Sequence, residues 1–202
     1  MNICRRPIYA KIRSIYVKIH PIYAIIACGF LLIATQSCKD DETISRRYPC
    51  RFQFYVEQHA TSIVFSACKS PGSYVFISTK IDEKGIRHVY AQSNNAKMPV
   101  EDNIISTDKE ANYTAYLLGA NNEIGLIVGC TNFSGLAAYD RICPNCPDLR
   151  PLVWSANGQK VQCNRCQRTY DLETGTLVNG AAGDALLRYG CNFDGTRLSV
   201  GN

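Results

Sequence analysis

Two Cys-x-x-Cys pairs constrain the fold of this chain more than any other feature. The first pair is Cys143 and Cys146, the second is Cys163 and Cys166, and sixteen residues separate the two pairs. Two cysteines three positions apart on a tight turn can direct both sulfurs at one ion, and two such turns on neighbouring hairpins complete a tetrahedron of thiolates. The spacing therefore predicts one metal site with four cysteine ligands.

Two disulfides or four free thiols are the alternatives to a metal site. A disulfide within Cys-x-x-Cys closes a very small ring and is mostly redox-active, so two of them beside one hairpin are less expected than a single metal site. Four thiolates are typical of structural zinc, and the same ligands can hold a single iron or a [2Fe–2S] cluster. We expect zinc, which would join two loops and add folding free energy, with iron as the alternative.

The N-terminus has the features of a bacterial export signal. Within residues 1–37, a basic region is followed by a run of thirteen apolar residues at 22–34, too short to span a bilayer comfortably. The next residues, Thr35-Gln36-Ser37-Cys38, resemble a lipobox, although Thr35 and Gln36 depart from its usual residues. The resemblance implies a lipid on Cys38. The alternative is an uncleaved N-terminal helix with an unmodified cysteine.

The residues after Cys38 bear on the compartment. Lys39-Asp40-Asp41-Glu42 resembles the acidic tag of some surface lipoproteins of Gram-negative bacteria. This resemblance implies a protein anchored by lipid to the outer membrane or cell surface, with the periplasmic face as an alternative. We expect a signal peptide at 1–37, a tether at 38–50 and a folded domain at 51–202.

The net charge of +5 comes from the export signal alone. Residues 1–37 hold five basic and no acidic side chains, and removing these five from the 22 Lys and Arg leaves 17 against 17 Asp and Glu. A neutral folded domain gives no electrostatic reason to expect a nucleic-acid partner.

Export also affects the remaining cysteines. Of eleven cysteines, Cys4 and Cys28 lie in the signal, Cys38 is the expected lipid site, and four belong to the expected metal site. The remainder comprises Cys50, Cys68, Cys130 and Cys191. An even remainder in an oxidising compartment permits two disulfides in three pairings, and buried free thiols are the alternative.

Short apolar or alternating segments separated by turn residues predict an all-β sandwich or barrel. Strands are expected near residues 52–56, 74–78, 87–90, 135–140, 152–154, 160–162, 169–172, 186–189 and 196–200. Residues 62–66 fit either a strand or a short helical turn. Residues 92–112 are polar and predict a long loop. Residues 117–119 and 124–128, around the turn at Asn121-Asn122, predict a hairpin.

The order of features in the last third of the chain resembles the Rieske iron–sulfur domain. The matching residues are Cys143-Pro144, Cys163, Tyr170-Asp171, Thr174-Gly175, Gly180-Ala181, Leu186 or Leu187 with Tyr189, Asp194-Gly195 and Val200. The resemblance implies a Rieske-like β-sandwich over 51–202, with a zinc-ribbon-like metal-binding subdomain at about 140–175.

The ligand residues depart from the Rieske pattern. A Rieske centre uses two cysteines and two histidines, but Asn145 and Cys166 stand at the histidine positions. The histidines of the chain, His20, His59 and His88, all precede the motif, and we expect the last two to be ordinary surface residues. A four-cysteine site is therefore expected on a Rieske-like fold.

No pattern in the chain argues for catalysis. Acidic residues near the two motifs are expected to cap turns or face solvent: Asp140, Asp148, Asp171, Glu173 and Asp184. Arginines near them are expected to balance the charge of the site or form a docking rim: Arg141, Arg150, Arg165 and Arg168. Trp154 is expected in the core or in a cross-strand pair.

These features favour a non-catalytic binding or interaction module with an unidentified protein or ligand partner. The alternative is an electron-transfer protein that holds a [2Fe–2S] or mononuclear iron centre in the same site.

Overall fold

The computed structural model describes residues 43–95, 97–111 and 116–202. They belong to one compact unit, Thr43–Asn202. Among them, no helix combines the length and the apolar character needed to cross a membrane.

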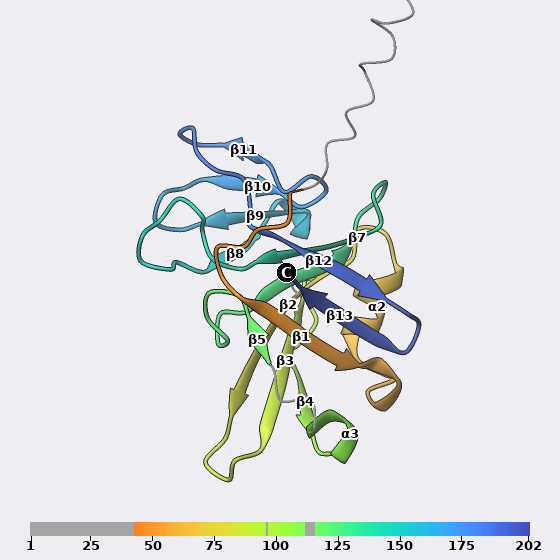
Figure 1. Ribbon diagram of the computed structural model, residues 1–202. Coiled ribbons are helices and arrows are strands. Elements are labelled where there is room, and N and C mark those ends of the chain that lie inside the picture. The colour runs from red at the N-terminus through yellow and green to blue at the C-terminus, as the bar shows by residue number, and fades with distance from the viewer. Residues whose placement is uncertain (1–42, 96, 112–115) are drawn as a thin grey trace, which may run out of the picture. The chain divides into compact units, whose positions relative to one another are not determined.

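The unit consists of two antiparallel sheets, with the smaller above the larger in the view of Figure 1. The large sheet has the strand order β4-β3-β2-β6-β7-β12-β13-β1-β5 and the small sheet the order β11-β10-β9-β8. The strands of the large sheet are β1 (Cys50–Tyr55), β2 (Tyr74–Ile81), β3 (Arg87–Ser93), β4 (Glu101–Ile105), β5 (Leu117–Leu118), β6 (Leu126–Cys130), β7 (Leu136–Asp140), β12 (Arg188–Phe193) and β13 (Arg197–Gly201). The small sheet comprises β8 (Leu152–Ser155), β9 (Lys160–Cys163), β10 (Thr169–Asp171) and β11 (Leu177–Asn179).

Three central strands, β2, β6 and β7, are buried on both faces because they separate two cores. Successive side chains of a strand point to opposite faces. In β2, Val75 and Ile77 enter the first core, whereas Tyr74 and Phe76 enter the second. The second core lies between these strands and the small sheet and contains three of the four motif cysteines. The metal motif is thus built against the back of the large sheet.

The large sheet curls over the first core. Four strands stand between β1 and β2 in the sheet order, yet Phe52 and Phe54 of β1 share this core with Val75 and Ile77 of β2. Helix α2 (Ile63–Lys69) packs against β2, β3 and β6. The structure therefore confirms the coarse part of the predicted fold: antiparallel β-sheets packed around buried cores.

Residues 62–66, which fitted either a strand or a helical turn, begin helix α2. The Ser62 hydroxyl accepts a hydrogen bond from the Val64 N–H at 3.3 Å, as an N-cap does. The helix buries Val64, Ala67 and Cys68, whose spacing places them on one face.

The prediction of a long loop at 92–112 is wrong in part. Strand β3 continues to Ser93, β4 follows as an edge strand, and a short helix α3 (Asp108–Ala111) comes next. In β4, Asn103 and Ile105 are buried while Asp102 and Ile104 are exposed. The sequence of β4 shows no alternation of apolar and polar residues, because both the solvent face and the inner face of this edge strand carry polar side chains.

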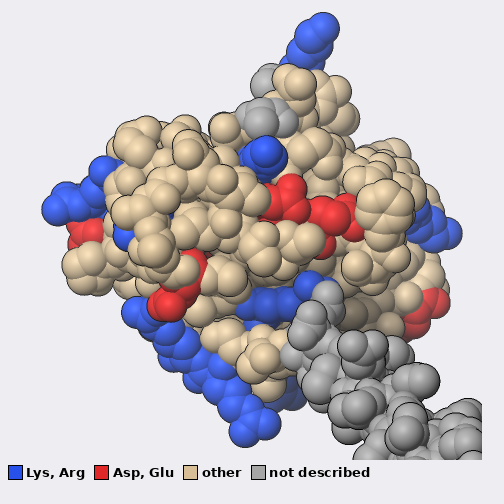
Figure 2. All heavy atoms as spheres, turned by 90° about the horizontal axis from the view of Figure 1, so that it is seen from above, with Lys and Arg blue, Asp and Glu red and all other residues tan. Residues whose placement is uncertain are grey.

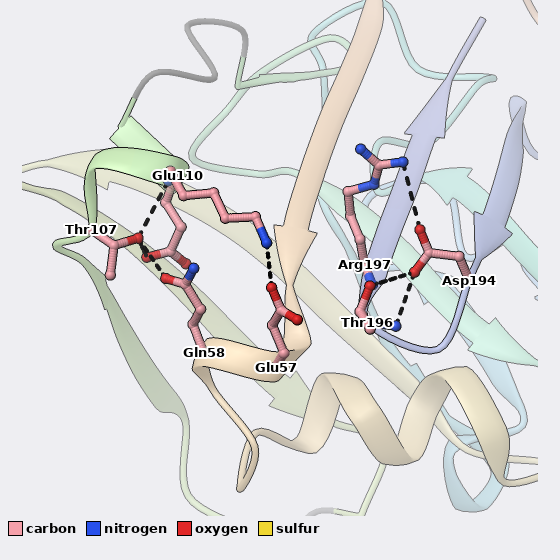
Figure 3. Close-up of polar contacts among 8 residues, drawn as sticks. Glu57, Gln58, Thr107, Glu110, Asp194, Thr196 and Arg197 are labelled. Carbon is pink, nitrogen blue, oxygen red and sulfur yellow. Dashed lines mark hydrogen bonds and ion pairs between the residues drawn. The ribbon is translucent and has the colours of Figure 1, made fainter.

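Polar contacts, partly buried and partly exposed, attach α3 to the segment after β1, which includes the short 3-10 helix η1 (Val56–Gln58). Figure 3 shows Thr107 and Glu110 facing Gln58, and the Thr107 hydroxyl donates to Glu110 Oε2 at 2.9 Å. The Glu110 carboxylate is buried and lies 2.7 Å from His59 Nε2. A second turn in Figure 3 is closed by Asp194, which joins β12 to β13 as the sequence predicts.

The predicted hairpin of residues 117–119 with 124–128 does not form. Strand β5 pairs with β1, through Leu118 opposite Cys50, and β6 pairs with β2 and β7. The Leu118 N–H donates to Asn122 Oδ1 at 2.9 Å, so a side chain rather than a partner strand satisfies it. The Asn-rich turn redirects the chain between different parts of the sheet.

Candidate metal centre

The four motif cysteines converge. The Sγ atoms of Cys143, Cys146, Cys163 and Cys166 all lie within 4.8 Å of one another. Two close pairs join the two turns: Cys143 to Cys166 at 3.6 Å and Cys146 to Cys163 at 3.7 Å. The first three cysteines are buried and Cys166 is half-buried. The group could bind a metal ion.

The first turn begins where β7 ends. Asp140 Oδ1 accepts a hydrogen bond from the Ile142 N–H at 3.1 Å, and the Cys143 N–H donates to the Arg150 carbonyl at 2.8 Å. Leu149, directly before Arg150, has a φ of 46°, which turns the chain back on itself. The backbone thus fixes Cys143 and Cys146 between two hydrogen-bonded ends.

The second turn begins where β9 ends and has the same construction. The Cys163 N–H donates to the Arg168 carbonyl at 2.9 Å, and the Gln167 N–H donates to the Cys163 carbonyl at 2.8 Å. Gln167 has a φ of 59°, in the left-handed region. The predicted hairpin of β8 and β9 positions this turn, with Trp154 opposite Val161 and Leu152 opposite Cys163.

A third segment, near residue 184, contacts the site through Asn145. The Asn145 Nδ2 donates to the Asp184 carbonyl at 2.8 Å and to the Tyr170 hydroxyl at 2.9 Å, while Asn145 Oδ1 accepts from the Asp184 N–H at 2.8 Å. The Tyr170 hydroxyl lies 3.5 Å from Cys143 Sγ. Asn145 therefore ties the first turn to β10 and to the chain before β12.

Sequence reasoning assigned neither Asn145 nor Tyr170 a role around the sulfurs. Their position within or near the motif was visible, but their mutual hydrogen bond depends on the packing of β10 against the first turn.

The thiols of the group differ in acidity. Burial raises the pKa of Cys143 and of Cys146. Burial also acts to raise the pKa of Cys166, but hydrogen bonds from the Arg168 backbone and guanidinium outweigh it and lower this pKa to about 6. The same contact raises the pKa of Arg168. Arg168 thus supplies positive charge directly to one sulfur.

The other arginines near the motifs lie elsewhere than expected. Arg141 stacks over the Phe76 ring at 4.0 Å, and burial lowers its pKa to about 10. Arg150 and Arg165 pair with Asp148, at 2.7 Å and 3.5 Å. Among the described contacts, Arg168 is therefore the only one of the four arginines that hydrogen-bonds the sulfur of a motif cysteine.

Asp140 caps a turn through the Ile142 N–H, which is one of the two expectations for the nearby acidic residues, but it does not face solvent. It is fully buried, and it accepts hydrogen bonds from the Tyr189 hydroxyl at 2.9 Å and the Ala120 N–H at 2.8 Å. Burial raises its pKa, against these hydrogen bonds. Asp140 therefore organises the chain at the entrance to the first turn.

Glu173 and Asp171 cap turns, as expected. Glu173 accepts hydrogen bonds from the Asn132 and Phe133 N–H groups at 2.7 and 2.9 Å, and Asp171 accepts from the Thr174 N–H at 3.1 Å. Glu173 thereby joins the small sheet to the β6–β7 turn of the large sheet.

The four cysteines outside the motif that the structure describes are free thiols. Cys50, Cys68, Cys130 and Cys191 form no disulfide in the structure, which agrees with the alternative of free thiols. Burial raises the pKa of Cys50, Cys68 and Cys191 to about 12.

Both described histidines are more enclosed than an ordinary surface residue. His59 stacks on Phe54 and contacts the buried Glu110 carboxylate, while His88 Nδ1 lies 2.9 Å from Asp102 Oδ1. Neither belongs to the group of four cysteines. The interpretation of them as ordinary surface residues therefore holds only in part, since both side chains remain partly exposed, at 14% and 16%.

No protein-family model, curated protein or solved structure matches this chain. The export signal and Cys38 lie outside the described residues, so they remain predictions from the sequence.

Proposed function

We propose that this chain is an exported, lipid-anchored, non-catalytic binding or interaction module, whose four-cysteine group holds a structural zinc ion. The observation that carries the proposal is the convergence of four sulfurs, from two separate turns, within 4.8 Å. The metal joins the two turns and holds the small sheet in shape, since a structural zinc site contributes folding free energy.

The sulfur spacing fits a single tetrahedral ion. A zinc–sulfur bond of about 2.3 Å gives sulfur–sulfur edges of about 3.8 Å in a regular tetrahedron. The pairs Cys143–Cys166 and Cys146–Cys163, at 3.6 and 3.7 Å, lie close to that value, and all four sulfurs lie within 4.8 Å of one another. The donor set is sulfur only, which is typical of zinc or of mononuclear iron.

The same geometry disfavours a two-iron cluster. In a [2Fe–2S] centre each iron takes two of the four ligands, so ligands on different irons stand farther apart than the edges of one tetrahedron. Mononuclear iron uses the same four sulfurs as zinc. An electron-transfer function through that ion is the alternative, and the colour of the protein distinguishes it.

The arrangement of ligands also supports a non-catalytic role. A catalytic zinc site keeps a position open for water or substrate, whereas four thiolates close the coordination sphere. Three of the four cysteines are buried, and Asn145 and Tyr170 cover Cys143. Such a site leaves no coordination position open for a solvent molecule.

The Rieske-like family assignment belongs to the same proposal. It is supported by a metal motif that joins the small sheet to β7 and by the closing β12–β13 hairpin. In this proposal the family's fold is kept over 51–202, while Asn145 and Cys166 replace the histidine ligands.

The partner class is argued from charge. On the face drawn in Figure 2, Lys and Arg side chains gather along the lower-left edge, and Asp and Glu side chains lie beside them and in the centre. Residues 38–202 carry 17 Lys and Arg against 17 Asp and Glu. This supports a protein or ligand partner rather than a nucleic acid. The membrane contact is assigned to the lipid on Cys38, at the outer membrane or cell surface.

Replacement of the native metal by Co²⁺ tests the metal site. A tetrahedral cobalt–tetrathiolate has characteristic visible absorption bands that differ from those of octahedral cobalt. We expect these bands in the full chain at one cobalt per chain, and their loss in Cys163→Ser. Octahedral bands, or bands unchanged in Cys163→Ser, would contradict the assigned ligands.

Membrane fractionation tests the anchor. Cys38→Ala should move the protein from the membrane to the soluble fraction and abolish incorporation of a radiolabelled fatty acid. Cys28→Ala is the matched control, because it removes a cysteine within the apolar run and leaves the lipid acceptor. Fatty-acid incorporation that persists in Cys38→Ala would refute lipidation at this residue.

A further inference from the structure

Trp154 is the one tryptophan of the chain, and its side chain is stacked on a neighbouring aromatic ring. Its indole stacks on the Phe76 ring, with centroids 3.6 Å apart and planes 2° from parallel. The Arg141 guanidinium lies over Phe76 at 4.0 Å. Phe76 is buried, so the stack anchors the indole to the back of the large sheet.

The part of Trp154 that reaches solvent is hydrocarbon. The side chain is half-buried, and the indole N–H is itself buried, with no hydrogen-bond partner among the described residues. Because Phe76 covers one face of the ring, the indole offers its remaining apolar surface to the outside. A rigid, flat, apolar surface of this kind suits a ligand that also has a flat apolar face.

A groove of about 550 Å³ lies against this surface. Its described lining comes from the β8–β9 hairpin and from the chain after β3: Trp154, Ser155, Asn157, Gly158, Asn94, Asn95 and Lys97. Apart from the indole the side chains are polar, and Lys97 is the only charged one among them. Volume, one aromatic surface and several neutral hydrogen-bonding groups are the usual elements of a small-molecule site.

The two walls of the groove are fixed to each other. Asn94 Nδ2 donates to the carbonyls of Gly72 and Gly158, at 2.9 and 3.2 Å, and Gln159 Nε2 donates to the Gly72 carbonyl at 2.9 Å. Gly158 has a φ of +78°, and a Cβ there would lie 2.5 Å from the Asn94 carbonyl oxygen. Such contacts pre-form the groove and reduce the ordering cost of binding.

We propose that this groove binds a carbohydrate, with the apolar C–H face of a pyranose ring on the indole of Trp154 and its hydroxyls toward Asn95, Asn157 and Ser155. Amide and hydroxyl side chains both donate and accept, as sugar hydroxyls require. A single-stranded nucleic acid would also stack, but it needs a positively charged groove, and Lys97 is the one cation here. The proposal is independent of the metal and of the lipid anchor.

The single tryptophan makes the test specific, because all indole fluorescence of the protein reports on this groove. The full chain in detergent is titrated with oligosaccharides of glucose, mannose, xylose, galactose, N-acetylglucosamine and galacturonic acid. We expect at least one of these to change the emission saturably, and calorimetry to give the same affinity. A panel in which no sugar changes the emission or produces heat overturns the proposal.

Variants connect the binding to the groove. Trp154→Ala should weaken the affinity by at least ~10-fold, and Asn157→Gly, which removes an amide from a residue with a φ of 58°, should weaken it by ~3-fold or more. Phe133→Ala is the control, because Phe133 is exposed on the β6–β7 turn and is not among the lining residues.

Metal content and thermal unfolding of each variant exclude a folding defect. Affinity unchanged in a folded Trp154→Ala or Asn157→Gly protein refutes the groove as the site. A saturable change with nucleotides and with no sugar refutes the ligand class.

Discussion

The two sheets of this protein are stabilised in different ways. The large sheet curls over a core of aromatic and aliphatic side chains from most of its strands, with a helix packed against it. The small sheet has four short strands, and three of the residues in the core beneath it are motif cysteines. Burial of apolar surface stabilises both cores, and in the proposed function a metal held by the four cysteines adds folding free energy to the second.

The thiols of the two regions show the same difference. In the large sheet and its helix, Cys50, Cys68 and Cys191 behave as small apolar residues, since burial raises each pKa to about 12. In the small sheet, hydrogen bonds from Arg168 overcome burial and lower the pKa of Cys166 to about 6. The contrast concerns Cys166 alone, because burial also raises the pKa of Cys143 and Cys146. A metal needs thiolates, so Arg168 prepares one of the four ligands.

The largest predicted effect is the loss of a motif cysteine. Cys163→Ser should abolish most metal binding and lower the melting temperature sharply, because structural zinc contributes about 10–16 kcal/mol of binding free energy in small domains. Metal analysis and calorimetry measure both. Cys68→Ala is the control in the large core and should cost about 1–2 kcal/mol with full metal content. Equal shifts in the two variants would remove the distinction between the regions.

A truncation in the large core should give the opposite pattern. Phe54→Ala leaves a cavity where a fully buried ring packs against Phe52 and His59, and should cost about 3–5 kcal/mol in the free energy of unfolding. Denaturant unfolding measures the cost. The folded variant should retain one metal per chain, and a variant that folds but binds no metal would show that the two regions are not separable.

Alkylation compares the thiols directly. In metal-free protein at pH 7.5, iodoacetamide should modify Cys166 at least ~100-fold faster than Cys68. Cys68 stays buried with a raised pKa, whereas Cys166 is half-buried and is largely thiolate where its contacts with Arg168 persist. Peptide mass spectrometry over time gives the two rates, with Cys166→Ser identifying the fast site. Bound metal should suppress the fast reaction. Comparable rates at the two cysteines would contradict the electrostatic difference.

The smallest effect concerns the edge of the large sheet. A hydrogen bond to Asp102, together with Asp82, raises the pKa of His88. A raised pKa in the folded state means that the interaction stabilises fully below about pH 6.5 and is lost as the pH rises through the folded value. NMR titration should show this pKa falling in Asp102→Asn, with metal content unchanged. An identical titration in both proteins would place the cause elsewhere.

The sequence was most informative where local chemistry decides the structure. The motif spacing predicted that Cys143, Cys146, Cys163 and Cys166 meet, and the β8–β9 hairpin and the Asp194-Gly195 turn have strong local patterns. Strand β2 was also predicted, because a continuous apolar run between turns fits a strand that is buried on both faces.

The failures occurred where tertiary contacts decide. Strand β4 carries polar residues on both faces, and β5 pairs with β1, far away in sequence, instead of with its neighbour. An aspartate next to a turn usually faces solvent. Asp140 is instead a buried hydrogen-bond acceptor, because the Tyr189 hydroxyl and the Ala120 N–H both donate to it. Such pairings depend on long-range packing, which local patterns do not encode.

The most direct test of a structural metal is its identity and stoichiometry in the full chain, purified without added metal or chelator and examined by elemental analysis and absorption spectroscopy. The account predicts one zinc per chain and no visible absorption band. Iron with a visible charge-transfer band would contradict the structural-zinc assignment in favour of electron transfer. A protein without metal, in which the four motif cysteines are oxidised, would contradict the metal site itself.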